Sequence, residues 1–303
     1  MRLPGTNLDL DLDLLHGGHV DFGKLNVHQL VVRRQETWIT LGLAFLFLLA
    51  CFCLFSNLGQ GSLFNNDDAI YGSLIWRLHH SPHSIFAQLG WRQPLYYLLL
   101  YVSTWIFGVN ELGLRMVAAI SGMLVLIVTY WMGLRLYRDR RVALVAALVM
   151  MASLLFYLFT RRVRGLDITL LLFIELSVLF GLAAFDEPKH WITAGLFAGL
   201  AVLTKSVVGL VPVAVLGFAV LAMRRWDLLR RWQTYAGLGV AAAVSSLWPL
   251  MALTHGNAAG IWQHFIFHVG KRAMTMVVSR HDTSFYYFKM LWGFEGLLGI
   301  FFL

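Results

Sequence analysis

The chain has 303 residues, of which 59% are hydrophobic and 13% are charged, with a formal net charge of +8. A soluble protein carries about 25% charged residues, so this composition excludes an ordinary soluble domain. Only helices or closed barrels satisfy the backbone within lipid, and no series of alternating strands is visible, so we predict an all-α, polytopic membrane protein. The basic residues cluster in loops between apolar runs, where membrane topology and lipid phosphates explain them without nucleic acid.

Residues 1–36 form a tail, and the first apolar run follows at Thr37–Asn57. No basic region precedes a short apolar core in this tail, so it does not have the pattern of a signal peptide. Arg33 and Arg34 stand just before the run, and positive charge favours the cytoplasmic side of a span. We therefore expect a cytoplasmic tail, a first span from residue 37, and an extracytoplasmic segment at Leu58–Pro94.

The next apolar run, Pro94–Gly108, decides the topology of the rest of the chain. It falls short of the roughly 20 residues of a full span and is rich in Tyr and Trp, which favour the membrane interface. If this run crossed the membrane, the basic segments 135–141 and 224–231 would lie outside. If it lies on the outer surface as an amphipathic helix, both segments become cytoplasmic, and we predict this second arrangement.

The remaining apolar runs predict about eight spans in total, within a transmembrane domain that covers residues 37–303. These runs are Leu112–Leu134, Val142–Thr160, Ile168–Phe185, Trp191–Leu203, Val207–Met223, Tyr235–Leu253 and Phe285–Leu303. The last run is still apolar at the final residue. We therefore expect a chain truncated at its C-terminus.

A group of charges falls on the predicted outer side, where positive charge is disfavoured. Arg161, Arg164 and Asp167 recur every three residues and would share one face of a helix end. Arg presents a fork of donors that matches phosphate oxygens. Lys205 ends another run, where it could bind the same phosphate or extend to the lipid headgroups. We interpret the group as a site for an anion, in which Asp167 would hold the guanidinium of Arg164 while the site is empty.

Asp67 and Asp68 precede a helical pattern and allow three interpretations: a general base, a metal site or a helix N-cap. An N-cap explains one of the two carboxylates well and the second only in part. Adjacent carboxylates repel unless a cation is near. That cation could be Arg92 or a divalent ion such as Mg²⁺ or Mn²⁺, which Asp67 and Asp68 would hold.

Two groups of histidines are less specific. Those in the segment 79–83 have helical spacing that would allow metal ligation, although interfacial helices often carry such residues with no ligand. His264, His268 and Arg272 recur every four residues, which places a basic stripe on one helix face. The stripe could be solvated, or it could contact a substrate.

Several short motifs, in their order and spacing, resemble those of the GT-C glycosyltransferases. They are Asn66–Tyr71, Gln93–Tyr97, Phe107-Gly108, Arg115, Arg135–Tyr137, Arg164–Asp167 and Leu203–Lys205. The resemblance covers about residues 37–290 and is to the branch of protein O-mannosyltransferases and lipid A aminoarabinose transferases. It implies a membrane helical bundle with extracytoplasmic juxtamembrane helices, an extracytoplasmic active site and a polyprenyl-phosphate sugar donor.

The resemblance also implies inverting transfer of a hexose or pentose to a lipid, glycan or protein hydroxyl, at the bacterial inner membrane. Asp67 would be the general base with Asp68 beside it. Arg161, Arg164, Lys205 and Arg92 would bind the donor phosphate, supported by Asp167, Tyr71, His264, His268 and Arg272. No cofactor is implied beyond a possible divalent metal.

Two motifs depart from the family pattern. The family usually has Asp-Glu where this chain has Asp67-Asp68, and a doubled proline where this chain has Gln93-Pro94.

The competing interpretation is a transporter or flippase of a polyprenyl-linked sugar. Such proteins tend to show internal repeats and interrupted helices near the midplane. The absence of a visible repeat and the charges on one membrane face favour the enzyme.

Overall fold

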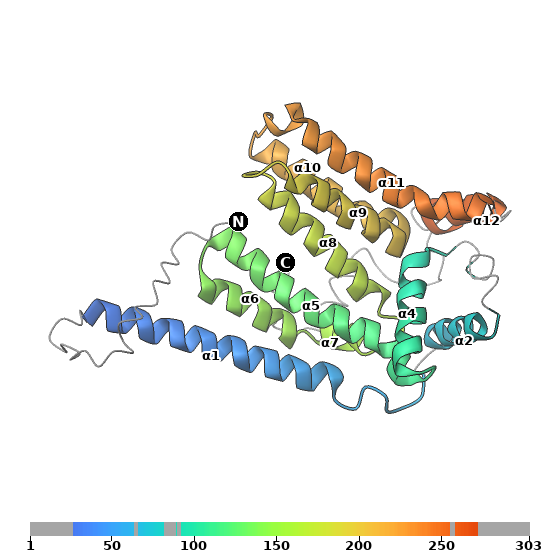
Figure 1. Ribbon diagram of the computed structural model, residues 1–303, viewed down its shortest axis with the longest axis horizontal. Helices are drawn as coiled ribbons and strands as arrows, with labels where there is room; N and C mark the ends of the chain where they lie inside the picture. The colour runs from blue at the N-terminus through green and yellow to red at the C-terminus, as the bar shows by residue number, and fades with distance from the viewer. Residues whose placement is uncertain (1–26, 64–65, 82–88, 90–91, 255–257, 272–303) are drawn as a thin grey trace, which may run out of the picture. The chain divides into compact units, whose positions relative to one another are not determined.

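The computed structural model describes residues 27–63, 66–81, 89, 92–254 and 258–271 (Figure 1). Within this part of the chain every regular element is a helix, so the all-α prediction is confirmed. The chain divides into two units, residues 1–43 and 44–303. Helix α1, Val27–Phe55, begins in the first unit and ends in the second.

The second unit contains all the other described helices. They are α2 Asn66–His80, α4 Pro94–Phe107, α5 Glu111–Tyr137, α6 Arg140–Ala152, α7 Leu154–Thr160, α8 Leu166–Ala183, α9 His190–Lys205, the 3-10 turn η4 Ser206–Leu210, α10 Val211–Ala222, the 3-10 turn η5 Leu228–Arg230, α11 Trp232–Thr254, α12 Ala258–Gln263 and the π-helix η6 His264–Lys271.

Five helical stretches in the described residues are long and apolar enough to cross a membrane. They are Glu36–Phe55, Glu111–Tyr137, Leu166–Ala183, His190–Ala222 and Trp232–Thr254. Helices α6 and α7 together make a sixth if this bent pair is one span. The number of about eight spans stays a prediction, and its last run, Phe285–Leu303, lies outside the described residues.

Helices α5 and α8 are neighbours that run parallel to each other. Near their beginnings the Ser121 and Thr169 hydroxyls are 3.0 Å apart, and near their ends Arg135 donates to the carbonyl of Leu182 at 3.0 Å. Helices α6 and α7 connect α5 to α8 in the sequence, and α6 packs on α5 where Ala143 meets Gly133. Helix α9 runs back along α8, since Ser177 donates to the carbonyl of Ala194.

The predicted span Val142–Thr160 is bent rather than straight. It divides at Ser153 into α6 and α7, whose axes differ by 67°. Ser153 has an extended backbone (φ −66°, ψ 125°), and its hydroxyl accepts from the amide of Phe156 at 3.1 Å. A serine side chain that caps a new helix offers the backbone an alternative to the helical ladder, which explains the bend.

The helical run His190–Ala222 folds back on itself at the η4 turn. A Cβ on Gly209 would lie 2.2 Å from the amide nitrogen of Val202, whereas residues seven apart along a straight helix are about 10 Å apart. Ser206 has a positive φ of 50° at the start of this turn. Trp191 of α9 and Val220 of α10 consequently share one apolar cluster, so α9 and α10 are antiparallel.

Helices α9 and α11 pack closely through small residues. A Cβ on Gly195 would lie 1.9 Å from the carbonyl oxygen of Gly237, and one turn later a Cβ on Gly199 would lie 2.6 Å from the Cβ of Val244. Glycines spaced four apart let helix backbones approach in membranes, where packing rather than the hydrophobic effect holds helices together.

These directions give the second unit two ends. The α2 end contains α2, the beginnings of α5 and α8 and the end of α9, which meet through Arg164 and Lys205. The Arg135 end contains the end of α5, the end of α8 and the basic loop after α10, which meet through Arg135 and Arg225. Helix α4 is short and packs against α2, α5 and α9 at the α2 end.

Candidate active site

Two adjacent carboxylates in the first turn of α2 have different surroundings. Asp67 forms an ion pair with the guanidinium of Arg164, and the two side chains are 45% and 43% exposed. Asp68 is 1% exposed, and its Oδ1 accepts from the backbone amide of Arg164 at 3.0 Å. Helix α2 begins at Asn66, so neither carboxylate is its N-cap. Asp67 is open to a ligand, whereas Asp68 holds the loop before α8 in place.

A second ion pair joins α8 to α9. Asp167, in the first turn of α8, pairs with Lys205 in the last turn of α9. The expectation that Asp167 would hold the guanidinium of Arg164 is wrong. Arg164 lies in the turn before α8, so the rule that residues three apart share a helix face does not apply to it. Each cation is instead paired with a carboxylate from another element.

Arg161 takes no part in these two ion pairs, because its side chain has other partners. Its Nη1 donates to the carbonyl of Cys53 at 2.7 Å and its Nη2 to that of Ser56 at 2.8 Å. Its guanidinium also lies over the ring of Tyr157, 5.4 Å from the centroid. Arg161 therefore binds the last turn of α1, where carbonyls without helical partners carry partial negative charge. The shared helix face predicted for Arg161 and Arg164 is not present.

Arg115 contributes to the same region, although the sequence alone assigned it no role. Its side chain is 7% exposed, and its terminal nitrogens donate to the carbonyls of Leu58, Gln60, Gly61 and Ser62 at 2.8–3.0 Å. These bonds fix the turn that leads into α2. A single arginine within the apolar run at the start of α5 was the signal that could have identified it.

Tyr71 connects α2 to α4 beside the ion pairs. Its ring stacks on Tyr97 with centroids 4.9 Å apart and meets Tyr96 edge-on at 5.8 Å. Burial raises the pKa of the Tyr71 phenol, so Tyr71 stays a hydrogen-bond donor at neutral pH. Tyr97 in turn hydrogen-bonds with Arg92. The predicted supporting residue Tyr71 and the predicted cation Arg92 are thus linked through one aromatic side chain.

His264 is a buried residue, so the interpretation as part of a solvated stripe is wrong for it. It is 5% exposed, and its Nε2 is 3.1 Å from the side-chain amide nitrogen Nε2 of Gln93. The ring of Trp248 meets its ring edge-on, with centroids 5.2 Å apart. It begins a π-helix, in which residues four apart do not stack as in an α-helix. The side chain of His268 and all of Arg272 lie outside the described residues.

The described residues do not fit a divalent metal. Among them, no three His, Cys, Asp or Glu side chains could share an ion. Asp67 and Asp68 both bond to Arg164, whose positive charge disfavours a second cation there. His79 bonds to the hydroxyl of Thr104 at 2.9 Å and His80 to the carbonyl of Trp76 at 2.8 Å, so these rings have separate partners.

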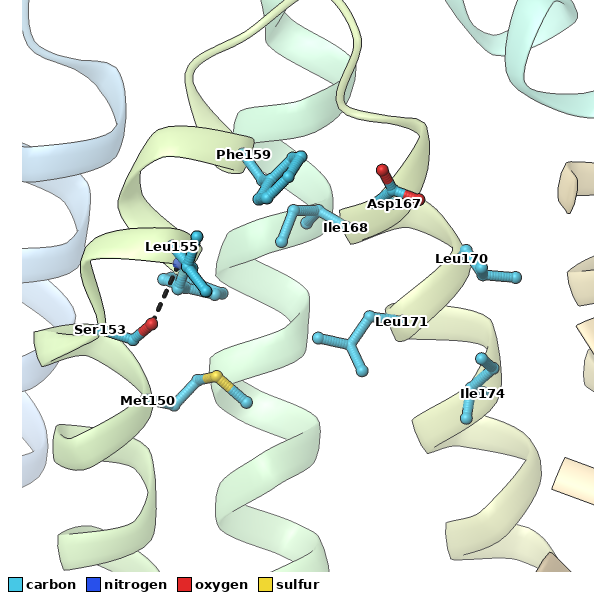
Figure 2. Close-up of a pocket in the computed structure, with 10 residues that line it drawn as sticks. Met150, Ser153, Leu155, Phe159, Asp167, Ile168, Leu170, Leu171 and Ile174 are labelled. Carbon is cyan, nitrogen blue, oxygen red and sulfur yellow. Dashed lines mark hydrogen bonds between the residues drawn. The ribbon is translucent and has the colours of Figure 1, made fainter. Parts of the chain in front are cut away.

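An apolar pocket of about 380 Å³ reaches from the α6–α7 bend to the beginning of α8. Figure 2 shows Asp167 at one end of it, with Leu170, Leu171 and Ile174 following along α8 and Met150 and Phe159 opposite. Of the described residues that line the pocket, Asp167 alone is charged, and its carboxylate pairs with Lys205. The pocket therefore joins an apolar surface to the charged α2 end.

The fold and the charged end define a class, the GT-C membrane glycosyltransferases. The chain superposes on crystal structures of ArnT from Cupriavidus metallidurans, bound to undecaprenyl phosphate and in the apo state, with TM-scores of 0.66 and 0.69 at 22% identity. These alignments cover 85% and 86% of this chain and 48% of ArnT. A family model for dolichyl-phosphate-mannose-protein mannosyltransferase matches residues 92–249, just over half of the chain, and the chain belongs to this family.

Curated relatives extend the match. The chain is 26% identical over 271 residues to the undecaprenyl phosphate-alpha-4-amino-4-deoxy-L-arabinose arabinosyl transferase of Pseudomonas aeruginosa, covering 85% of this chain and 48% of the relative. It is 27% identical over 224 residues to a protein of the same name from Pseudomonas fluorescens, covering 71% and 40%. The chain thus spans about half the length of the curated relatives it matches, or less.

The comparisons confirm the resemblance to the GT-C glycosyltransferases, on the branch that contains the aminoarabinose transferases. Together with the five long apolar helices, they establish an integral membrane protein of the bacterial inner membrane.

Proposed function

We propose that the chain transfers a sugar from a polyprenyl-phosphate donor to an acceptor at the outer face of the inner membrane. The observation that carries this proposal is the pair of ion pairs, Asp67–Arg164 and Asp167–Lys205, gathered at the α2 end. Two cations that each face a carboxylate can exchange it for a phosphate. The relatives named as arabinosyl transferases suggest undecaprenyl phosphate carrying 4-amino-4-deoxy-L-arabinose as the donor.

The donor phosphate binds Arg164 and Lys205 and takes Arg164 away from Asp67. Asp67 is then released beside the reacting sugar, where it can act as a general base. The acceptor hydroxyl attacks the anomeric carbon and its proton passes to Asp67, while the bond from that carbon to the phosphate oxygen breaks. The electron pair leaves with the polyprenyl phosphate, whose added charge Arg164 and Lys205 stabilise. The anomeric configuration inverts in this single displacement.

The remaining side chains prepare this site. Asp68 holds the amide of Arg164, and Arg115 holds the turn before α2, so both position the reacting pair. Tyr71 can donate a hydrogen bond beside Arg164. The apolar pocket next to Asp167 suits part of an isoprenoid chain (Figure 2). No step is assigned to a metal ion.

The proposal requires the α2 end to face outside. Arg138 and Arg225 lie at the Arg135 end, where the positive-inside rule places the cytoplasm. Single cysteines at loop positions of the two ends, labelled in intact cells by an impermeant thiol reagent, test this orientation. A cysteine replacing Arg162 should react from outside and one replacing Arg138 should not.

Transfer itself is tested with purified protein in nanodiscs. The protein is incubated with undecaprenyl phosphate carrying 4-amino-4-deoxy-L-arabinose, or carrying mannose, and with lipid A as acceptor, and the products are identified by mass spectrometry. Release of undecaprenyl phosphate together with a glycosylated acceptor supports the proposal. Movement of intact donor between leaflets of liposomes without cleavage would instead support the flippase.

A further inference from the structure

A second pocket, of about 270 Å³, borders the buried carboxylate of Asp68. Three arginines line it, Arg115, Arg161 and Arg162, together with the turn at 58–62 that Arg115 holds. All of these residues belong to the second unit. In the proposed transfer reaction Asp68 and Arg115 position the reacting pair, and no ligand has been assigned to the pocket itself.

The pocket carries an excess of positive charge. Arg115 and Arg161 donate only to backbone carbonyls, which satisfy N–H groups but bring no formal negative charge. Among the described residues of the lining, Asp68 is the single carboxylate beside the three arginines. Partly buried cations near a membrane are costly unless an anion balances them. An anion is therefore the class of ligand that this lining favours.

Arginine chemistry narrows the class of anion. Each terminal nitrogen of Arg161 carries two hydrogens and donates one of them to α1, so the guanidinium keeps donors for a ligand. A fork of donors on a fixed guanidinium matches the oxygens of a phosphate. Tyr157 and Leu158, near the end of α7, form an amphipathic wall of the same pocket. A phosphate attached to an apolar molecule would place its oxygens on the arginine donors and its apolar part against Tyr157 and Leu158.

We propose that this pocket binds the phosphate group of a membrane lipid. It lies where the apolar helices α1 and α7 end, which is the level of lipid headgroups in a bilayer. It is separate from the donor cations, because Arg164 and Lys205 face Asp67 and Asp167. Asp68 connects the two sites: it lines this pocket and also accepts from the amide of Arg164.

The lipid can come from two sources that share this phosphate chemistry. An anionic phospholipid such as phosphatidylglycerol would occupy the pocket as part of the bilayer. A phosphate-bearing acceptor such as lipid A would occupy it during transfer. Binding measurements with each lipid distinguish the sources and do not depend on whether the protein transfers a sugar.

The test is native mass spectrometry of the purified protein titrated with phosphatidylglycerol, with lipid A and with diacylglycerol, which has no phosphate. Arg162→Gln removes one lining charge, and Arg161→Lys keeps a charge but loses the fork. Arg141→Gln is the matched control, because Arg141 is exposed in the first turn of α6, at the Arg135 end. The apparent Kd for at least one phosphate lipid should rise about tenfold or more in Arg162→Gln, as expected for a lost charge-assisted hydrogen bond.

Arg161→Lys should weaken binding of the same lipid less than Arg162→Gln does, and diacylglycerol binding should not change in either variant. A loss confined to phosphatidylglycerol identifies a bilayer lipid, and a loss confined to lipid A identifies the acceptor. If both folded variants bind both phosphate lipids as tightly as the wild type and Arg141→Gln do, the pocket is not a phosphate site.

Discussion

The two ends of the second unit both contain ion pairs, but the pairs are built differently. At the Arg135 end, Arg225 pairs with Asp227 two residues away, and Arg135 pairs across 51 residues with Asp186, which is 65% exposed. At the α2 end, Arg164 pairs with Asp67 and Lys205 with Asp167, partners 97 and 38 residues apart in the chain. The α2 end also contains the buried Asp68 and Arg115.

This difference separates charges that serve topology from charges that form a site. Exposed ion pairs contribute little to stability, and the positive charge of Arg135 and Arg225 suits a cytoplasmic loop. At the α2 end the two pairs join α2 to the turn before α8 and α8 to α9, beside the buried Asp68 and Arg115, so several elements meet around one cluster of charges. The contrast between the two ends therefore leads to predictions in which each substitution has a counterpart at the other end.

The largest effect is expected for Asp67→Asn. Loss of a general base typically lowers a rate by about 10²- to 10⁴-fold, so the turnover number for sugar transfer should fall by that factor while the protein still inserts and folds. Asp186→Asn, which also removes the carboxylate partner of an arginine, should leave turnover unchanged. Steady-state transfer rates of the two purified variants give the comparison. Near-normal turnover in Asp67→Asn would remove Asp67 from the mechanism.

The next effect concerns the donor phosphate. Arg164→Ala should weaken donor binding by about 10- to 100-fold, since hydrogen bonds between charged groups contribute roughly 1.5–3 kcal/mol. Arg164→Lys should restore only part of the affinity, because an ammonium lacks the fork. Arg225→Ala at the Arg135 end is the control and should bind donor normally. Donor titrations in nanodiscs measure all three, and equal affinities throughout would exclude Arg164 from the phosphate site.

Asp68 and Asp67 are adjacent in sequence, but substituting them should affect the stability of the protein differently. Asp68→Ala removes a buried carboxylate and leaves the amide of Arg164 without its acceptor, which should lower stability by about 1–3 kcal/mol. Thermal unfolding in detergent should show a lower midpoint for Asp68→Ala and almost none of this change for Asp67→Ala. The account of Asp68 as a structural acceptor is wrong if the two variants unfold alike.

Much of this arrangement of helices and charges could be predicted from the sequence. The apolar runs located α5, α8 and α11 to within a few residues, and the charge rule drew attention to Asp67, Arg164 and Lys205, which the structure brings to one end. The pairing of the charges could not be read from periodicity, because it depends on where chain segments distant in sequence meet.

Other features were hidden for local reasons. The bend at Ser153 has no proline or glycine to announce it, and it arises from a side-chain cap that competes with the helix. Arg161 was predicted to bind the donor phosphate together with Arg164, but two carbonyls at the end of α1 hold its guanidinium there instead. Arg115 shows the same use of a guanidinium on backbone carbonyls.

The smallest effect is a pH dependence at the contact between α2 and α4. Burial, followed by the nearby His80, lowers the pKa of His79 below its usual value, so the folded state favours the neutral ring. The unfolded state then binds more protons near its own pKa of about 6.5, and the stability that His79 contributes is present above that pH and lost as the pH falls. Thermal unfolding between pH 7 and 5 should show a weaker acid dependence in His79→Gln than in the wild type.

The central claim is that Asp67 and the donor phosphate compete for Arg164. Donor affinity of Asp67→Asn tests it most directly, measured by titration of undecaprenyl phosphate carrying 4-amino-4-deoxy-L-arabinose into nanodiscs. Removing the competing carboxylate should leave donor affinity equal to or higher than that of the wild type, even though transfer is lost. If Asp67→Asn binds the donor as weakly as Arg164→Ala does, the exchange of the carboxylate for the phosphate does not occur.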